Sequence, residues 1–433
     1  MQRDAMAKLK AWKDKGQRKP LLLRGARQTG KTWLLKEFGQ SEFDSLAYVD
    51  LLASSRAREV FDGDFDIPRI VSALSVESGT KIEAGKTLIV LDEIQEAPRA
   101  LTALKYFCQD APNYHVAAAG SYLGIAKHEG VSFPVGKVNM LSLDPMSFLE
   151  FLDATGEGAA AEALREKGAA GIDPALSGKM EQLLREYLFV GGMPEAVGSF
   201  VAERDYPAVR EVHREILDAY DLDFSKHAPV RILERMRLVW EGLPAQLAKE
   251  SKKFVYGAVR PGGRARDFEE SIQWLADYGA VHRVSRVSAL RVPLTAYRDG
   301  GAFKLFCVDV GLLGALAHLQ PSVLLEGSRL FTEFRGALTE QYVCQQLVAC
   351  GMPPAYWSSD TGRAEVDFAV ELDGEPVPVE VKAAENLQSK SLKVARDRFG
   401  LRRCVRTSLS GYRDEGWLVN IPLWAIASLG PLA

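Results

Sequence analysis

The chain has 433 residues, of which 47% are hydrophobic and 26% charged, and its formal net charge is -3. This composition is typical of a soluble globular protein, and the small negative charge excludes a globally basic nucleic-acid binder. The five cysteines form no Cys-x-x-Cys pair, which indicates neither a zinc site nor a disulfide framework. No apolar run is long enough to cross a bilayer, so we expect a cytoplasmic protein.

Near the N-terminus, residues 25–32 read Gly-Ala-Arg-Gln-Thr-Gly-Lys-Thr, between the apolar run 21–23 and the helix-forming run 33–38. Glycines at both ends let backbone N–H groups surround a polyphosphate at the N-terminus of a helix. Lys31 is expected to reach the β- and γ-phosphates of ATP and Thr32 to hold Mg²⁺. An ordinary glycine-rich turn is the alternative, but it would need no Lys-Thr after its second glycine. The predicted nucleotide-binding residues are Gly25, Arg27, Gln28, Thr29, Gly30, Lys31 and Thr32.

Residues 87–93 predict a buried parallel strand that ends in Asp92 and Glu93. We expect Asp92 beside Mg²⁺ and Glu93 as the residue that polarises the attacking water. The next predicted strand, 115–119, ends before Ser121, which is expected to sense the γ-phosphate; a simple turn serine is the alternative. Alternating strands (46–51, 87–93, 115–119 and 137–143) and helices (67–76 and 99–109) predict an α/β fold with a doubly wound parallel sheet.

The middle of the chain is expected to be helical, with a connector at 154–178 that is rich in Ala and Gly and a sharp turn at 191–194. A basic loop, a helix at 267–278 and strands at 281–287 and 303–308 are consistent with a winged helix. Its basic residues could contact DNA, which we expect rather than RNA, or could simply be solvated. The predicted contact residues are Lys252, Lys253, Arg264 and Arg266.

Near the C-terminus, Asp373-Gly374 separates two alternating runs, 364–372 and 375–382, and predicts a β-hairpin. With Leu372 opposite Glu375, one face of the hairpin is expected to be apolar. This face would carry Val366, Phe368, Val370, Val377, Val379 and Val381.

The opposite face of that hairpin would pair Asp367 with Glu380, and Glu365 with Lys382. Two facing carboxylates repel each other unless a cation lies between them, so the pattern favours Mg²⁺ or Mn²⁺ there. Glu340, on a predicted helix just before the hairpin, is expected to complete the metal ligands, and Lys382 to assist nuclease-like hydrolysis. A hairpin with a solvated charged face is the alternative.

Along nearly its whole length the chain resembles a prokaryotic AAA-type ATPase family whose C-terminal domain, of unknown function, is similar to PD-(D/E)XK nucleases. The matching residues are 25–32, 91–94, 120–121, 191–194, 253–256, 264–266, 274–275, 309–312, 365–368 and 380–382. The resemblance implies ATP hydrolysis through Lys31, Thr32, Asp92 and Glu93. It also implies a winged-helix middle and a nuclease-like site at Glu340, Asp367, Glu380 and Lys382. Lys137 stands where family members usually have arginine, whose planar fork lysine lacks.

These observations predict an ATPase domain at 1–154, a helical connector or lid at 155–225, a winged helix at 226–325 and a restriction-endonuclease-like α/β domain at 326–433. Two functions stay open. The first is an ATP-driven enzyme acting on nucleic acid, and the second is a nucleotide-controlled switch that binds DNA or a partner without cleavage. A metabolic kinase shares only the phosphate loop. The sequence leaves the oligomeric state open, with a homo-oligomer as one outcome.

Overall fold

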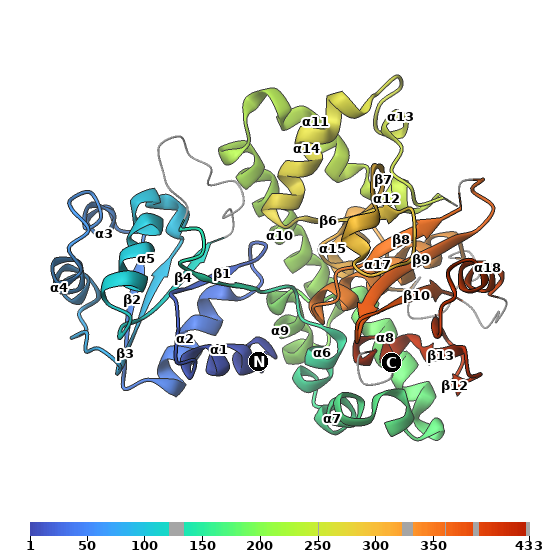
Figure 1. The fold of residues 1–433 in the computed structure, drawn as a ribbon, viewed down its shortest axis with the longest axis horizontal. Coiled ribbons are helices and arrows are strands. Elements are labelled where there is room, and N and C mark those ends of the chain that lie inside the picture. Colours follow the sequence, from blue (N-terminus) through green and yellow to red (C-terminus); the bar gives the residue numbers. More distant parts are fainter. Residues whose placement is uncertain (121–133, 250, 323–331, 360, 384–388, 430–433) are drawn as a thin grey trace. The chain divides into compact units, whose positions relative to one another are not determined.

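The computed structural model describes the chain except residues 121–133, 250, 323–331, 360, 384–388 and 430–433 (Figure 1). The chain divides into two compact units. The smaller contains Gln2–Asp144 and the short segment Asp277–Gly279, and the larger contains Met1, Pro145–Ala276 and Ala280–Ala433. Among the described residues, no helix is both long and apolar enough to cross a membrane.

The smaller unit is built on a five-stranded sheet with the order β2-β3-β4-β1-β5. Its strands are β1 (Leu21–Arg24), β2 (Ser45–Asp50), β3 (Thr87–Asp92), β4 (His115–Gly120) and β5 (Asn139–Ser142). All neighbouring strands pair in parallel. The predicted parallel α/β sheet is therefore confirmed, and β4 lies between β1 and β3.

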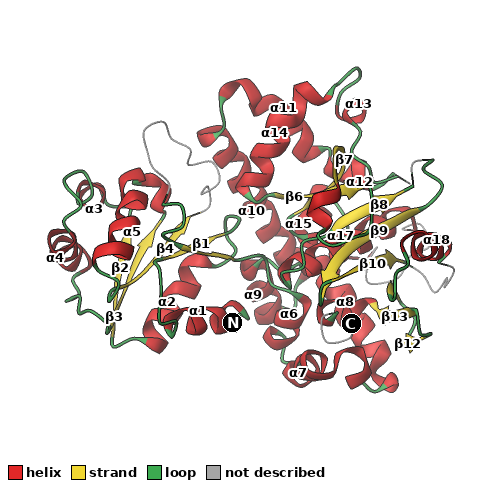
Figure 2. Cartoon of the chain, viewed as in Figure 1, coloured by secondary structure: helices red, strands yellow, loops and turns green. Residues whose placement is uncertain are grey.

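Helices cover both faces of this sheet (Figure 2). On one face Leu88 and Val90 of β3 pack with residues of α1 (Ala5–Lys13) and α2 (Lys31–Glu42). On the other face Ile89 and Leu91 pack with residues of α3 (Ser55–Glu59), α4 (Ile67–Ser78) and α5 (Pro98–Asp110). Because successive side chains of a strand point to opposite faces, a continuously apolar strand such as β3 needs a helical layer on each side.

The middle of the chain is helical, as expected. It contains α6 (Phe148–Ala154), α7 (Gly158–Lys167), α8 (Ser177–Val190), α9 (Pro194–Glu203), α10 (Tyr206–His227), α11 (Val230–Glu241), α12 (Leu243–Leu247), α13 (Tyr256–Val259) and α14 (Ala265–Tyr278). The predicted sharp turn lies between α8 and α9. Only glycine fits at its second position, because a Cβ atom on Gly192 would lie 2.1 Å from the carbonyl oxygen of Met146.

The larger unit also contains an eight-stranded mixed sheet with the order β12-β13-β11-β10-β9-β8-β6-β7. Its strands are β6 (Val281–Val287), β7 (Arg298–Cys307), β8 (Ala355–Ser358), β9 (Glu365–Leu372), β10 (Glu375–Val381), β11 (Cys404–Ser408), β12 (Arg413–Asp414) and β13 (Leu418–Pro422). The accompanying helices are α15 (Val310–Leu316), α17 (Thr332–Ala349) and α18 (Lys390–Phe399).

The β6–β7 hairpin corrects one expectation. Its two strands pair antiparallel, as predicted for a wing. However, β6 also pairs in parallel with β8, so the hairpin extends the C-terminal sheet rather than forming a wing with a sheet of its own. The sequence could not reveal this, because β6 and β8 are separated by more than sixty residues of chain.

Candidate functional site

Residues 25–30 form a loop between β1 and α2, and Lys31 and Thr32 begin α2, in the predicted order of strand, loop and helix. Gly30 has φ of +88° and Gln28 has φ of +62°, so the backbone turns through the left-handed region twice. At Gly25 a Cβ atom would lie 2.2 Å from the Leu143 carbonyl oxygen, which leaves room only for glycine. The loop thus leads directly into the N-terminus of α2, whose first N–H groups have no partner within the helix and suit an anion.

Lys31 is held inside this loop. Its side chain is 7% exposed, and its Nζ donates hydrogen bonds to the carbonyl oxygens of Gly25 at 3.0 Å and Ala26 at 2.7 Å. Burial lowers the pKa of Lys31 to about 8, against the raising effect of the Glu93 and Asp92 carboxylates. An anion bound in the loop would therefore stabilise the charged ammonium.

The hydroxyl of Thr32 donates a hydrogen bond of 2.6 Å to Oδ2 of Asp92. Thr32 belongs to α2 and Asp92 ends β3, and Asp92 is only 4% exposed. The fold therefore brings together a hydroxyl and a carboxylate that lie sixty residues apart in the chain. This oxygen pair fits the known ligands of Mg²⁺ in phosphate-loop enzymes, a threonine and the aspartate of the neighbouring strand.

Two further residues orient the carboxylates of Asp92 and Glu93, and the sequence pattern indicated neither of them. The hydroxyl of Tyr48, in β2, donates to Oδ2 of Asp92 at 2.9 Å. The amide of Gln95 donates to Oε2 of Glu93. Glu93 itself has φ of +50°, a conformation that non-glycine residues adopt rarely and that turns the chain directly after β3.

Arg3 is a third residue that the sequence pattern did not indicate. Its guanidinium is buried and donates to the carbonyl oxygens of Thr29 at 2.8 Å and Asp144 at 2.7 Å. It therefore ties the phosphate-binding loop to the chain that follows β5. Ser121, the predicted γ-phosphate sensor, lies outside the described residues, and Lys137 is half-buried just before β5.

The predicted hairpin of β9 and β10 is present with most of its expected register. Leu372 pairs with Glu375, Val370 with Val377 and Phe368 with Val379. Within the described chain the pairing of these two strands ends there, and the Val381 N–H instead donates to the Asp367 carboxylate at 2.8 Å.

The expected apolar face of that hairpin is wrong at Val366. The register between β8 and β9 shifts between Ala355 and Trp357. As a result Val366 packs in the same apolar cluster as Ala369, although three positions separate them, whereas Phe368 lies against Phe306. One additional residue in a strand reverses the faces of the residues beyond it.

Two carboxylates of the predicted metal site, those of Glu340 and Asp367, lie around a lysine together with the Glu365 carboxylate. Nζ of Lys304, in β7, lies 2.8 Å from the Glu365 carboxylate, 3.7 Å from that of Glu340 and 3.9 Å from that of Asp367. The Lys304 side chain is fully buried. Burial would lower the pKa of Lys304, but the charges of Glu340, Asp367 and Glu365 outweigh burial and raise it.

The remaining charges of this region are also paired. Lys382 lies 2.8 Å from Glu380. Burial raises the pKa of Glu340 to about 7 and raises that of Asp367, in each case against the opposing charge of Lys304. Among the described residues, no group of three or more His, Cys, Asp or Glu side chains could hold a metal ion. The fold thus brings Glu340 and Asp367 together as predicted, but around an ammonium group.

The predicted nucleic-acid residues differ in exposure. Lys253, Arg264 and Arg266 are exposed. Lys252 is buried, donates to the Lys249 carbonyl oxygen at 2.7 Å and lies 4.0 Å from Glu340, so it is not on the surface.

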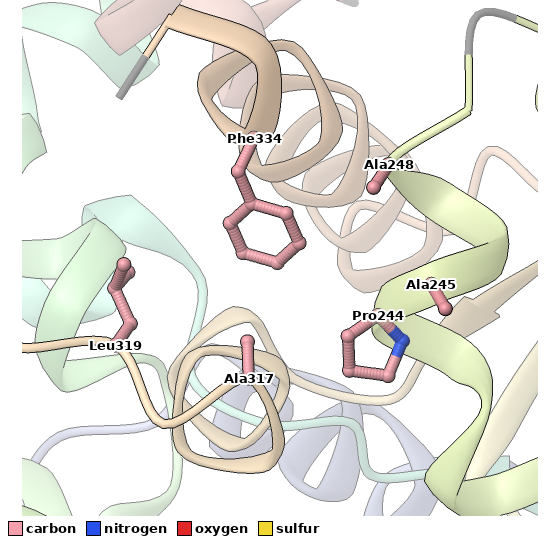
Figure 3. Close-up of a pocket in the computed structure, with 6 residues that line it drawn as sticks. All are labelled: Pro244, Ala245, Ala248, Ala317, Leu319 and Phe334. Carbon is pink, nitrogen blue, oxygen red and sulfur yellow. The ribbon is translucent and has the colours of Figure 1, made fainter. Parts of the chain in front are cut away.

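An apolar pocket of about 390 Å³ lies in the larger unit (Figure 3). It is lined by Pro244, Ala245, Ala248, Ala317, Leu319 and Phe334. None of these side chains offers a hydrogen-bonding group to a phosphate or a base, and none belongs to a predicted site. We therefore assign no nucleotide to it.

Three ranges of the chain match known protein families. Residues 17–152 match the family described as the AAA domain. This AAA domain contains the phosphate-binding loop, Asp92 and Glu93, and it bears out the ATPase part of the resemblance noted from the sequence. Residues 181–323 and 335–425 match two families described only as domains of unknown function, DUF8612 and DUF4143.

Three solved structures show a distant likeness to the chain. The Walker-type ATPase PABY2304 of Pyrococcus abyssi is 14% identical with a TM-score of 0.46, over 72% of this chain and 95% of that one. The Orc1 protein of Aeropyrum pernix, solved in complex with DNA, is 14% identical with a TM-score of 0.31, over 73% and 93%. The RuvB Holliday junction branch migration motor of Thermotoga maritima is 15% identical with a TM-score of 0.30, over 68% and 91%. At these scores the likenesses carry no argument about function. No curated protein matches the chain significantly.

Proposed function

We propose that the chain is a Mg²⁺-dependent ATPase whose hydrolysis site lies in the AAA domain. The observation that carries this proposal is the 2.6 Å hydrogen bond between the Thr32 hydroxyl and the Asp92 carboxylate. It joins the end of the phosphate-binding loop to the end of β3, which are the two metal-binding elements of this class of enzyme.

Each residue of the site has a defined role in this proposal. Lys31 binds the β- and γ-phosphate oxygens, and Thr32 and Asp92 hold the metal, which neutralises charge on the phosphates. Glu93 orients and polarises the attacking water, and Gln95 holds the Glu93 carboxylate in position. Tyr48 holds Asp92 in the same way.

The proposal is tested by Glu93→Gln, with Glu96→Gln as the matched control in the same 3-10 turn. We expect Glu93→Gln to lower kcat for ATP roughly 10²- to 10⁴-fold while nucleotide binding is retained. Glu96→Gln should hydrolyse ATP as wild type does. Wild-type turnover by Glu93→Gln would refute the assigned role.

We further propose that the larger unit acts on nucleic acid by binding, under control of the nucleotide. The segment Asp277–Gly279 supports this control, because it belongs to the AAA-containing unit although it contains the last two residues of α14. The exposed residues Lys253, Arg264 and Arg266 support contact with phosphates.

The binding proposal is tested on DNA with the charge reversals Lys253→Glu, Arg264→Glu and Arg266→Glu combined. The variant should bind DNA more weakly and show a shallower dependence of affinity on salt concentration. Lys249→Glu, which changes a lysine of the same region outside the proposed contact, is the control. Unchanged affinity and salt dependence in the triple variant would contradict this contact surface.

A further inference from the structure

The position of Lys304 in its strand is unusual. It lies in β7 between Phe303 and Leu305, and its backbone is also bridged to Lys253. Lysine side chains are almost never fully buried unless they are paired. The Lys304 ammonium is paired on one side with three carboxylates, and it lies 5.0 Å from the ring centre of Tyr356 on another.

The charges around Lys304 are nearly balanced without any added ion. Four carboxylates lie in this region, those of Glu340, Glu365, Asp367 and Glu380. They are accompanied by three ammonium groups, those of Lys304, Lys252 and Lys382. Buried carboxylates need such partners, because an unpaired charge is costly away from water.

The Lys304 ammonium lies where a cation shared by Glu340, Glu365 and Asp367 would lie. A divalent metal needs several oxygens at about 2.0–2.6 Å, whereas the Lys304 ammonium approaches the Glu365 oxygen at 2.8 Å and lies within 4 Å of the other two carboxylates. A metal bound by Glu340 and Asp367 would lie next to this ammonium, and the two positive charges would repel each other.

We propose that Lys304 takes the place that a divalent metal ion occupies in restriction-endonuclease-like domains. The ammonium neutralises Glu340, Glu365 and Asp367 and holds β7, β9 and α17 together. The C-terminal domain then has no metal to activate water for phosphodiester cleavage, and it serves as a binding module. This inference does not depend on ATP hydrolysis in the AAA domain, so the two proposals can fail separately.

The first test measures Mn²⁺ binding to the full-length wild-type protein without nucleotide, by electron paramagnetic resonance. The same titration of Asp367→Asn and of Glu340→Gln is the control, because Mn²⁺ that binds in the AAA domain contributes equally to all three titrations. We expect the three titrations to agree within error. A wild-type Mn²⁺ site that disappears in Asp367→Asn or Glu340→Gln would overturn the proposal.

The second test removes the ammonium with Lys304→Met and uses the exposed Lys253→Met as its control. Lys304→Met leaves the carboxylates without their cation, so its unfolding midpoint should fall, and millimolar Mn²⁺ should raise it again. Wild type and Lys253→Met should show no such Mn²⁺ response. A Lys304→Met protein as stable as wild type in the absence of metal would contradict the role of Lys304. If Lys304→Met does not fold, the wild-type titrations alone decide the question.

Discussion

The carboxylate of Asp309 accepts a hydrogen bond of 2.6 Å from the backbone N–H of Gly192, 117 residues away in the chain. It also accepts bonds from the Leu312 N–H at 3.0 Å, which caps α15, and from the Gln345 amide of α17 at 2.8 Å. Two stretches that carry the family resemblance, 191–194 and 309–312, therefore meet at one buried side chain. Their shared role is structural, because Asp309 joins the turn after α8 to α15 and α17.

We expect Asp309→Asn to destabilise the larger unit by about 1–3 kcal/mol. Both oxygens of Asp309 accept N–H groups, and an asparagine would place its own NH₂ against one of them. Urea unfolding measures the change. Asp373→Asn, at an exposed turn position with φ of +49°, is the control and should stay within about 0.5 kcal/mol of wild type. Equal stability of the two variants would show that Asp309 does not link these elements.

The segment Asp277–Gly279 offers a test of its contact with the phosphate-binding loop. A Cβ atom on Gly279 would lie 3.2 Å from the backbone nitrogen of Ala26, and the φ of Gly279 is +88°. We expect Gly279→Ala to displace Ala26, whose carbonyl holds Lys31, and to weaken ATP binding several-fold. A fluorescent ATP analogue measures the affinity.

Gly262→Ala is the matched control for that substitution. Gly262 has φ of +77° but no atom near the position of its Cβ, so it carries the same backbone strain of about 1 kcal/mol without the contact. ATP affinity that falls equally in both variants would mean that the contact with Ala26 is irrelevant.

The buried side chain of His213 is expected to make the protein less stable in acid. Its Nε2 bonds the Val190 carbonyl oxygen at 2.9 Å, and its Nδ1 faces the Arg210 guanidinium at 3.2 Å. Burial, and then the charge of Arg210, lower the pKa of His213 to about 3. The imidazole of His213 therefore binds a proton more readily in the unfolded chain than in the folded one. The contribution of neutral His213 to the free energy of unfolding is complete above about pH 6.5 and is lost as the pH falls towards 3.

We expect protonation of His213 to lower the free energy of unfolding by roughly 1–4 kcal/mol between neutral pH and pH 4. In His213→Gln the difference in stability between pH 7 and pH 4, measured by urea unfolding, should be smaller than in wild type. Exposed His318→Gln is the control. Identical pH profiles for wild type and His213→Gln would rule out this explanation.

The parts of the fold that the sequence predicted are those with local signals. The apolar run of β3, the Lys-Thr that begins α2 and the Asp373-Gly374 turn each depend on neighbouring residues, and each appears where expected. The pairing of β6 with β8 and the register shift at β9 depend on residues far apart in the chain, and no local pattern encodes them.

The same distinction applies to the sites. Thr32 and Asp92 meet as expected, because both sit at strand or helix ends that a parallel sheet brings to one edge. Arg3 and Tyr48 act through contacts that only the folded chain creates. Lys304 did leave a signal, since a lone lysine within the apolar run 303–308 must find carboxylates if that strand is buried.

The most direct test of the central claim is the Mg²⁺ dependence of ATP hydrolysis by wild type, Thr32→Ser and Thr32→Val. Serine keeps the hydroxyl that bonds Asp92 at 2.6 Å, and valine replaces it with a methyl group of similar size. We predict Mg²⁺-dependent turnover in wild type and Thr32→Ser, and a loss of roughly 10²-fold or more in Thr32→Val. Turnover that is unaffected by chelating Mg²⁺, or that survives in Thr32→Val, would contradict a metal site at Thr32 and Asp92.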